Sequence, residues 1–299
     1  MKISIYALHL GFGGVEKYVI TLANMLADAH DVEIISTYKM QDKPAFYVKP
    51  EVKIRYLIEG LKPNREEMRS ALKKKNPLLI LKEGWRSLKI LCLKRHRNIV
   101  SLKHCRSDVI ISTRIFHNLL IGKYACPDIV KITGEHNHHN NDPKYIASVI
   151  SSCEGFDYFI PISKELCEYY CKDMKNIGVE TKYIRFCIDE NPDKKKPVFA
   201  GKNLISVGRF SHEKGMIDLI SLFRRLHAED SSMLLNIVGD GEEYPVVSDL
   251  IRTYNLQDSI VLHGFRDKQY IYRLMQDMSL YVMTSYTESF GIVLLEAMS

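Results

Sequence analysis

The sequence lacks the features that would place it in several large classes of protein. It contains no run of about 18 apolar residues, so we expect no transmembrane helix. Its seven cysteines include no C-x-x-C pair, which favours reduced thiols in a cytoplasm over a disulfide framework. The start, MKISIYALHLGFGG, does not have the layout of a signal peptide, because its apolar run is short and leads into glycines. The 299 residues predict a soluble, cytoplasmic protein of two domains, each of ~100–200 residues.

Two familiar phosphate-binding fingerprints are also missing. The loop LGFGGVE joins an expected strand to an expected helix, where glycines let backbone N–H groups approach an anion. Gly11 and Gly13 fit the first two glycines of G-x-G-x-x-G, but Glu16 occupies the third position. The absence of G-K-[ST] excludes a Walker loop. The loop alone is therefore a weak sign of a ligand, and a tight turn without one is the alternative.

Charge is distributed unevenly along the chain. The formal net charge is +6, yet residues 61–107 hold 14 Lys and Arg against 3 Asp and Glu, which gives this segment +11. Apolar residues recur there at helical spacing from Leu78 to Leu93 and include Trp85, the only tryptophan. A basic amphipathic helix is typical of contact with an anionic membrane surface, although a solvated helix packed on its own domain fits equally well. Nucleic acid is not an expected partner, because no binding motif or aromatic stacking platform accompanies the charge.

Strand and helix patterns alternate along most of the chain. Seven strands are expected first: KISIYAL, DVEIIST, VKIRYLI, DVIIST, DIVKITG, DYFIPIS and TKYIRFCI. The aperiodic stretch DENPDKKKPVFAGKN then predicts a linker, and four more strands follow: LISVGRF, LLNIVGD, SIVLHGF and LYVMTSY. This rhythm predicts an α/β protein with two tandem Rossmann-like domains, residues 1–190 and 191–299, and a ligand cleft at the carboxyl ends of the strands.

The second domain reads as incomplete. Its helices are expected to begin near Lys214, Glu242, Lys268 and Phe290, which gives it four strand–helix units. No glycine or proline follows Met298 to mark the end of the last helix. We therefore expect this domain to lack its last strands and helices.

Two cations follow the first strand of the second domain. In VGRFSHEKG, Arg209 ends the strand and Lys214 lies five residues on, where a helix is expected to begin. Two cations at the carboxyl end of a strand, beside a helix N-terminus, suit a diphosphate. A pair of solvated surface charges is the simpler alternative, and the position at the strand end favours the diphosphate.

Two glutamates bracket an apolar segment in TESFGIVLLEAMS. The helix is expected to begin at Phe290 or Gly291, so Glu288 lies in the loop before it and Glu296 lies inside it. The N–H groups of Phe290, Gly291 and Ile292 would have no partner within the helix. A helix so apolar is expected to be buried, and a buried carboxylate needs partners such as ribose or sugar hydroxyls. The alternative is that Glu288 caps the helix and Glu296 pairs with an arginine.

Three histidines gather in TGEHNHH. His136, His138 and His139 do not have the spacing of a familiar ligand set, and no flanking cysteine or carboxylate pattern completes one. No metal site is therefore expected.

Five motifs, in this order, resemble those of a known family: GGVE, GRFSHEKG, IVGDGEEY, VLHGF and the E-x7-E segment ESFGIVLLE. Over nearly the whole chain the sequence is similar to the retaining glycosyltransferases of family 4, which have the GT-B fold and build bacterial polysaccharides, lipopolysaccharides and glycolipids. One departure is RFCID, which stands where the family usually has PNG-V/I-D. Family members continue past EAMS, so the resemblance also implies a chain truncated at its C-terminus.

The resemblance implies a role for each matching residue. Arg209 and Lys214 would hold the donor diphosphate, His136 would touch the donor sugar, and Glu288 would bind it. Glu296 matches the carboxylate on the nucleotide ribose. The resemblance assigns donor binding to residues of the glycine loop, of two strand ends and of the last helix with the residues before it. These are Gly13, Gly14, Gly239, Phe265, Phe290, Gly291, Ile292 and Glu296.

The implied reaction moves a hexose or N-acetylhexosamine from a nucleotide diphosphate sugar, with UDP the expected nucleotide, to a saccharide or lipid-linked acceptor. Arg209, Lys214 and the helix amides would stabilise the charge on the leaving diphosphate. The acceptor hydroxyl would attack from the same face and pass its proton to a phosphate oxygen, so no nucleophile, metal or other cofactor is expected. The enzyme would work in the cytoplasm, at the inner face of the membrane if residues 61–107 contact lipid.

Three alternatives stay open at this point. One is another nucleotide-sugar enzyme on the same fold, such as an epimerase. The second is an inactive fragment that binds a nucleotide sugar or a partner without turnover. The third is a nicotinamide-dependent oxidoreductase, against which Glu16 argues by replacing the third glycine.

Overall fold

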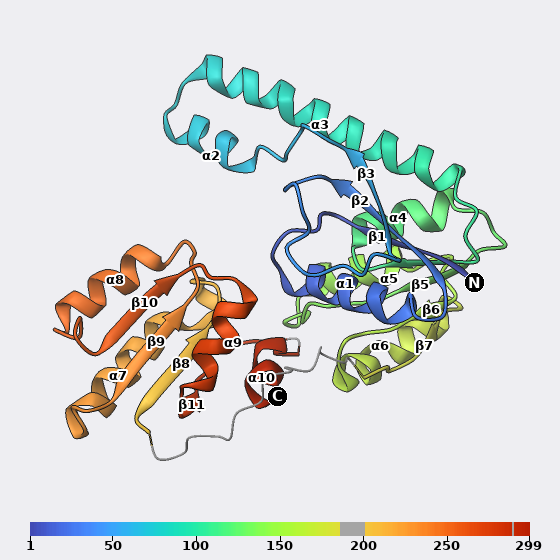
Figure 1. Ribbon diagram of the computed structural model, residues 1–299. Coiled ribbons are helices and arrows are strands. Elements are labelled where there is room, and N and C mark those ends of the chain that lie inside the picture. The colour runs from blue at the N-terminus through green and yellow to red at the C-terminus, as the bar shows by residue number, and fades with distance from the viewer. Residues whose placement is uncertain (186–200, 289) are drawn as a thin grey trace. The chain divides into compact units, whose positions relative to one another are not determined.

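The computed structural model describes residues 1–185, 201–288 and 290–299 (Figure 1). The chain divides into two compact units, Met1–Phe186 and Cys187–Ser299. Each unit contains one parallel sheet with helices between its strands, as the sequence predicts. The predicted domain boundary at 190/191 and nearly all of the predicted linker lie outside the described residues.

The sheet of the first unit has the order β3-β2-β1-β4-β5-β6-β7, and every strand pair is parallel. Its central strands are rich in β-branched residues, as expected where both faces of a sheet are buried. Ile5 lies opposite Ile34 on one side and Ile111 on the other, and this row forms the middle of the core. The strands are β1 (Lys2–Ala7), β2 (Asp31–Tyr38), β3 (Lys53–Ile58), β4 (Val109–Ser112), β5 (Val130–Thr133), β6 (Tyr158–Phe159) and β7 (Glu180–Thr181).

Four helices of this unit follow strands in the usual alternation. They are α1 (Gly14–Leu26), α4 (Ile115–Tyr124), α5 (Pro143–Ser152) and α6 (Lys164–Asn176). Local capping fixes where two of them begin. The Asp142 side chain accepts a hydrogen bond from the N–H of Lys144, and the Ser163 hydroxyl accepts one from the N–H of Leu166.

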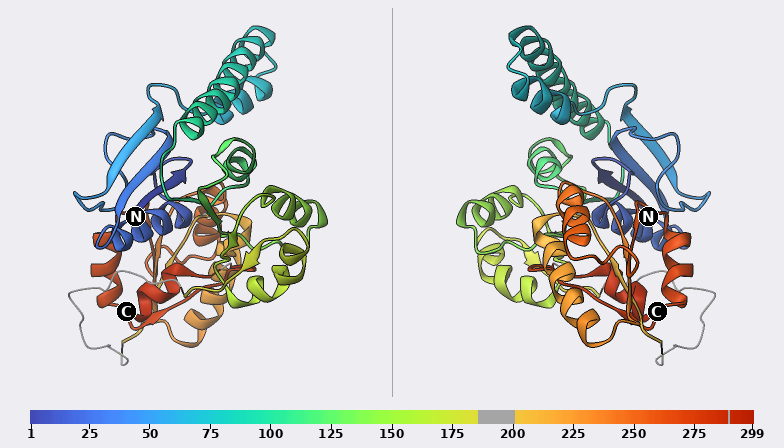
Figure 2. Two further views of the ribbon diagram at one scale, coloured as in Figure 1. Left: turned by 90° about the vertical axis from the view of Figure 1, so that its right-hand side faces the viewer. Right: turned by 90° about the vertical axis from the view of Figure 1, so that its left-hand side faces the viewer.

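The basic segment forms a helical hairpin between β3 and β4, made of α2 (Arg65–Lys73) and α3 (Pro77–Lys103). Helix α3 begins at Pro77 because the Asn76 side chain accepts hydrogen bonds from the next two N–H groups, and proline suits the first helical position. The C-terminal half of α3 packs on β2, β3 and α4, whereas its N-terminal half projects from the sheet of this unit together with α2 (Figure 2). In the part of the chain that the structure describes, no helix is long and apolar enough to cross a bilayer.

The sheet of the second unit has the order β10-β9-β8-β11, again with every pairing parallel. Its core is formed where Leu204, Leu235 and Ile237 of the sheet meet Phe223 and Val247 of the helices. The helices begin within two residues of the predicted positions. The elements are β8 (Asn203–Val207), η1 (His212–Lys214), α7 (Met216–Glu229), β9 (Leu234–Val238), α8 (Tyr244–Thr253), β10 (Ile260–Gly264), α9 (Lys268–Gln276), β11 (Leu280–Tyr281) and α10 (Ile292–Met298).

Three predicted strands are only two residues long in the structure. Strand β6 stops at Phe159, two residues before Pro161, which cannot donate to a ladder. Strand β7 covers only Glu180–Thr181, and the rest of TKYIRFCI either has no regular structure or lies outside the described residues. Strand β11 stops at Tyr281 because the polar groups beyond it bond to the start of α7 instead of continuing the ladder.

The prediction that the last helix is buried is wrong. No residue of α10 is fully buried, and Leu294 and Met298 are 38% and 77% exposed. Helix α10 packs on α9, and the described residues place no strand beyond β11 on that side of the sheet to cover its apolar face.

Candidate functional site

The strand order of both sheets creates one favoured place for a ligand. In each sheet, the second and third strands of the chain lie on one side of the first strand, and the next strand lies on its other side. The direction in which strands are added therefore reverses between β1 and β4 in the first unit and between β8 and β11 in the second. Loops that leave the carboxyl ends of strands on the two sides of such a reversal diverge, and ligands of open α/β sheets bind there. Most of the predicted site residues fall on these loops.

In the first unit, an ion pair with a buried carboxylate joins the loops on the two sides of the reversal. Glu16, in the first turn of α1, is 5% exposed, and its Oε1 lies 2.6 Å from Nη2 of Arg114, two residues after β4. His9 Nε2 approaches the same oxygen at 3.8 Å. The other Glu16 oxygen lies against Gly13, 2.1 Å from the point that a Cβ atom would occupy there, so a larger residue would require the carboxylate to shift. Gly14, the second glycine predicted for the site, is the first residue of α1.

His136 lies just after β5 and is only 8% exposed. Its ring centroid is 4.2 Å from that of Tyr18 on α1. Burial, with a contribution from Arg114, lowers the pKa of His136 to about 3, so the imidazole is neutral at physiological pH. Neither ring nitrogen has a hydrogen-bond partner among the described residues. Buried polar atoms are rarely left so, which fits the predicted contact to a substrate; that contact stays a prediction.

The other two histidines of this loop form an aromatic stack. His138 stacks on His139 at 4.7 Å, and His139 stacks on Tyr169 at 4.1 Å between ring centroids. The Nδ1 of His138 also lies 2.9 Å from the side-chain oxygen of Asn140. Within the described ranges, no group of three His, Cys, Asp or Glu side chains is arranged to hold a metal ion.

In the second unit, an ion pair again joins the loops on the two sides of the reversal. Lys214, at the end of η1, pairs through its Nζ with the Oε1 of Glu288, which lies in the loop after β11. The Ser285 hydroxyl donates to the same oxygen at 2.9 Å. Both charged side chains are about one quarter to one third exposed, at 31% for Lys214 and 26% for Glu288. The structure thus brings together two residues that the sequence assigned to the donor.

The loop after β11 is held by hydrogen bonds to η1 and to Gly215, the residue before α7. The Thr284 hydroxyl donates to the carbonyl oxygen of Gly215 at 2.9 Å, and the N–H of Tyr286 donates to the carbonyl oxygen of Glu213 at 2.9 Å. Gly215 has a φ of +60°, and a Cβ atom there would lie 2.2 Å from the Thr284 carbonyl oxygen. Only glycine accepts both this left-handed conformation and this close approach. The contact sets the position of Glu288, four residues further along.

Three further predicted residues lie at neighbouring strand ends. Arg209 is exposed and follows β8, Gly239 follows β9, and Phe265 follows β10 and is 53% exposed. Gly239 has a φ of +145°, and a Cβ atom there would lie 1.8 Å from the carbonyl oxygen of Gly208. Gly239 therefore allows the ends of β8 and β9 to approach closely, a packing role that the donor-binding assignment did not include.

The last predicted residues lie on or just before α10. Gly291 caps the helix in the left-handed region at φ +71°, so the helix begins at Ile292 and Phe290 stands before it. The Glu296 carboxylate, on the fifth residue of α10, accepts a hydrogen bond from the Tyr272 hydroxyl of α9 at 3.2 Å. The predicted alternative, an arginine partner for Glu296, stays a prediction.

Sequence reasoning missed two members of these clusters. Arg114 was not considered, because its partner Glu16 lies 98 residues away and nothing in the local pattern joins them. Tyr281 was read only as part of a strand, yet its hydroxyl donates to the Val207 carbonyl oxygen at 3.2 Å. Burial, and next the charge of Glu288, raise the pKa of Tyr281 to about 12.

Comparison with known proteins gives this geometry a context. Residues 188–299 match the model of the family described as "Glycosyl transferases group 1". The whole chain is 27% identical to a Campylobacter jejuni enzyme named N-acetylgalactosamine-N,N'-diacetylbacillosaminyl-diphospho-undecaprenol 4-alpha-N-acetylgalactosaminyltransferase, and covers 78% of it. Over 95% of its length the chain is 24% identical to the exopolysaccharide phosphotransferase SCO2592 of Streptomyces coelicolor, but it spans only 31% of that protein.

Among solved structures, the Staphylococcus aureus protein TarM superimposes with a TM-score of 0.74 at 13% identity, over all of this chain and 84% of TarM. The fold is that of the GT-B glycosyltransferases. The GT-B fold and the parallel Rossmann-like sheets predicted from the sequence are confirmed. The family model and the relatives together indicate a transferase enzyme, a glycosyltransferase. The assignment to family 4 and the truncation stay predictions.

Residues 188–299, which match the family model, contain the Lys214–Glu288 pair. They also contain the strand ends at Arg209, Gly239 and Phe265. The Glu16–Arg114 pair and His136 lie in the first unit, outside the matched segment. The individual donor-site assignments made from the sequence remain predictions for all of these residues.

Proposed function

We propose that this chain is a retaining glycosyltransferase that moves a hexose or N-acetylhexosamine from a UDP-sugar to a saccharide or lipid-linked acceptor in surface polysaccharide biosynthesis. The observation that carries the proposal is the Lys214–Glu288 pair at the β8/β11 reversal, with Arg209 two residues after β8, inside the segment that matches the glycosyltransferase model. The names of the relatives support the acceptor class, since one acts on a diphospho-undecaprenol-linked sugar. The solved structure of TarM contains UDP and supports the nucleotide.

In the proposed mechanism, Arg209 and Lys214 bind the diphosphate of the donor. Breaking the bond between the sugar and the diphosphate places negative charge on the leaving group, and cations already in position stabilise that charge. Glu288 and the N–H groups of Phe290, Gly291 and Ile292 bind the sugar, and Glu296 binds the ribose. His136 contacts the transferred sugar as a neutral imidazole, in keeping with its lowered pKa.

The acceptor hydroxyl attacks from the face that the diphosphate leaves, and its proton passes to a phosphate oxygen. The configuration at the anomeric carbon is then retained without a covalent intermediate on the protein. The proposal includes no metal, because Arg209, Lys214 and the amides supply the positive potential at the diphosphate. The acceptor is placed at the cytoplasmic face of a membrane, which the net charge of +11 on residues 61–107 would favour.

The test begins with binding. Heat-induced unfolding is followed with UDP, UDP-glucose, UDP-galactose, UDP-N-acetylglucosamine and UDP-N-acetylgalactosamine, and with ADP and GDP as controls. A ligand that binds only the folded state raises the midpoint, by an amount that grows with its concentration over Kd. The sugar that gives the largest shift is then supplied with acceptors, and NMR of the product reports its anomeric configuration. A folded chain that responds to no UDP compound, or a product of inverted configuration, would refute the proposal.

A further inference from the structure

One face of α3 carries large apolar side chains that no other part of the first unit covers. Leu78, Leu81, Trp85 and Leu88 are 78%, 61%, 68% and 53% exposed. Their spacing of three, four and three residues places them within an arc of about 80° around the helix, at about 100° per residue. Cys92, also exposed, continues the same line. We call the four apolar residues the α3 stripe.

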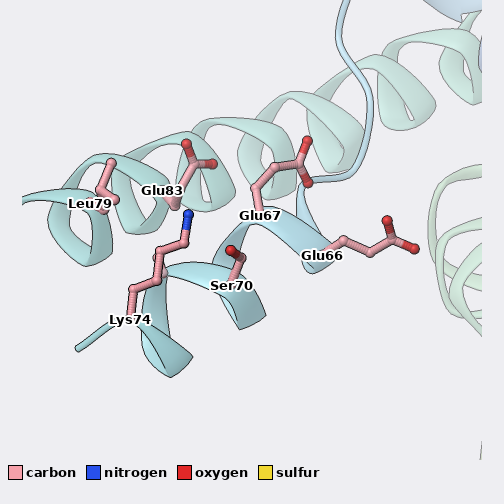
Figure 3. A pocket seen from close by; sticks show the side chains of 7 residues that line it. Glu66, Glu67, Ser70, Lys74, Leu79 and Glu83 are labelled. Atoms are coloured by element: carbon pink, nitrogen blue, oxygen red, sulfur yellow. The ribbon is translucent and has the colours of Figure 1, made fainter. Parts of the chain in front are cut away.

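The opposite face of α3 is polar and is occupied by α2. Glu83 lies about 180° around the helix from the centre of the stripe, and its Oε2 accepts a hydrogen bond from the Asn64 side chain at 2.7 Å. A cavity of about 460 Å³ lies on this side between the two helices, shown in Figure 3, and it is lined by Glu66, Glu67, Ser70, Ala71, Lys74, Leu79 and Glu83. The lining thus contains three glutamates and one lysine, and α2 covers this side of α3.

Basic side chains border the stripe. Lys82 and Lys89 are exposed and lie about 60–80° from the centre of the stripe, about two turns of the helix apart from each other along the axis. Neither enters an ion pair within the described part of the chain, whereas Arg86, further toward the α2 side, approaches Glu67 and Glu83. The charge next to the apolar face is thus uncompensated and positive.

The other half of α3 fixes this face relative to the first unit. The Asn98 amide donates to the Thr37 hydroxyl at 3.2 Å, and Lys94 Nζ lies 3.5 Å from the centre of the Phe116 ring. Ser101 bonds to the hydroxyl of Tyr6 in the sheet at 3.0 Å. The helix therefore cannot rotate to bury the stripe without breaking these buried contacts.

We propose that the α3 stripe inserts into an anionic lipid surface, with α3 parallel to that surface, Trp85 among the headgroups and acyl chains, and the α2 side turned to water. The charge beside the α3 stripe favours a lipid bilayer as its binding partner. Apolar side chains bordered by unpaired lysines match a bilayer that is apolar inside and anionic at its surface. A second protein chain with an apolar patch would not use these lysines. The inference deepens the proposed membrane contact by naming the inserted face and its orientation.

Trp85 offers a direct readout, because it is the only tryptophan of the 299 residues. The full chain is mixed with vesicles of phosphatidylcholine alone or with one third phosphatidylglycerol, and its emission is recorded. Insertion predicts a blue shift and quenching by brominated acyl chains with the anionic vesicles, and less than one tenth of that binding with phosphatidylcholine alone. Neither donor nor acceptor is present, so failure here leaves the proposed sugar transfer untouched.

Variants locate the inserted face. Leu81→Gln with Leu88→Gln, which keeps the reporter Trp85, should weaken vesicle binding at least tenfold, because each leucine loses an apolar contact that is worth about a factor of ten. Leu119→Gln on α4 is the matched control: Leu119 is also 53% exposed, and its replacement should leave binding unchanged. Lys82→Gln with Lys89→Gln should remove most of the preference for anionic lipid.

Three results would overturn the inference. One is vesicle binding that does not depend on anionic lipid. Another is equal binding of the Leu81/Leu88 variant and the Leu119 variant when circular dichroism shows both to be folded. The third is a Trp85 emission that is already blue-shifted without vesicles and changes with protein concentration, since this would assign the stripe to a contact between copies of the chain.

Discussion

Gly215 connects the backbone of the second unit to its proposed donor site, and Gly215→Ala tests that connection. The residue has a φ of +60°, where a side chain costs about 1–2 kcal/mol. In addition, the new Cβ atom would lie 2.2 Å from the Thr284 carbonyl oxygen, so the loop must move by about 1 Å to reach an ordinary contact. Thr284 belongs to the loop that carries Glu288, and a movement of this size loosens the Lys214–Glu288 pair.

Gly264→Ala is the matched control for Gly215→Ala. Gly264 lies in the same unit with a φ of +66°, but no atom lies within 4 Å of the point that a Cβ atom would occupy there. Both variants should therefore lose about 1–2 kcal/mol of unfolding free energy to the backbone conformation, and only Gly215→Ala should lose more. Denaturant titration measures stability, and calorimetry with UDP measures affinity, which we expect to fall at least tenfold in Gly215→Ala alone. Equal stability and equal UDP affinity in the two variants would refute the argument.

The remaining predictions concern three other groups. Arg209→Ala should lower kcat/KM by about 100-fold or more if Arg209 stabilises the leaving diphosphate, with Arg209→Lys recovering part of the loss; an unchanged kcat/KM would exclude that role. Glu16→Gln should destabilise the first unit by about 1 kcal/mol, because Arg114 loses its partner but is 32% exposed and stays partly solvated, and in a double-mutant cycle with Arg114→Gln the two losses should not add. Burial lowers the pKa of His136 and that of His117 to about 3. Between about pH 6.5 and pH 3 these histidines are protonated in the unfolded chain and neutral in the folded one, so the free energy of unfolding should fall as the pH decreases through this range. Replacing His136 with Gln should reduce that slope by about 1.4 kcal/mol per pH unit, whereas an unchanged slope in urea titrations from pH 7 to pH 4.5 would contradict the buried, neutral state.

Much of the fold could be predicted from the sequence because its signals are local. A parallel strand that is buried on both faces is rich in β-branched apolar residues, and β1, β2 and β4 have this composition. In the second unit the helix starts could be predicted to within two residues, since the change from strand to helix pattern is a local signal in the chain. The errors fall where a distant group decides. LYVMTSY has the pattern of a long strand, but Thr284 bonds to Gly215 before α7 and Tyr286 bonds to Glu213 of η1, so β11 stops at Tyr281.

The candidate site was predictable only in part, for the same reason. Strand ends and glycine loops could be located, and with them Arg209, Lys214 and Glu288 as candidates. Their pairing could not, because Lys214 and Glu288 are 74 residues apart and meet through the order of strands in the sheet. The packing role of Gly239 likewise depends on a carbonyl group from a different strand end. Sequence pattern gives the residue types, and topology decides which of them meet.

The two reversal points carry the same kind of ion pair, and burial separates their roles. Glu16 exposes 6% of its side chain and Arg114 exposes 32% of its own, so the carboxylate is out of water while the guanidinium is partly solvated, and removing Arg114 would leave a buried, uncompensated charge that costs several kcal/mol. Lys214 and Glu288 expose 31% and 26% of theirs, and a pair this accessible to water contributes on the order of 1 kcal/mol or less. A diphosphate offers Lys214 more charge than one carboxylate does. The exposed pair can therefore be exchanged for a ligand at little cost, whereas the buried pair holds its two loops together.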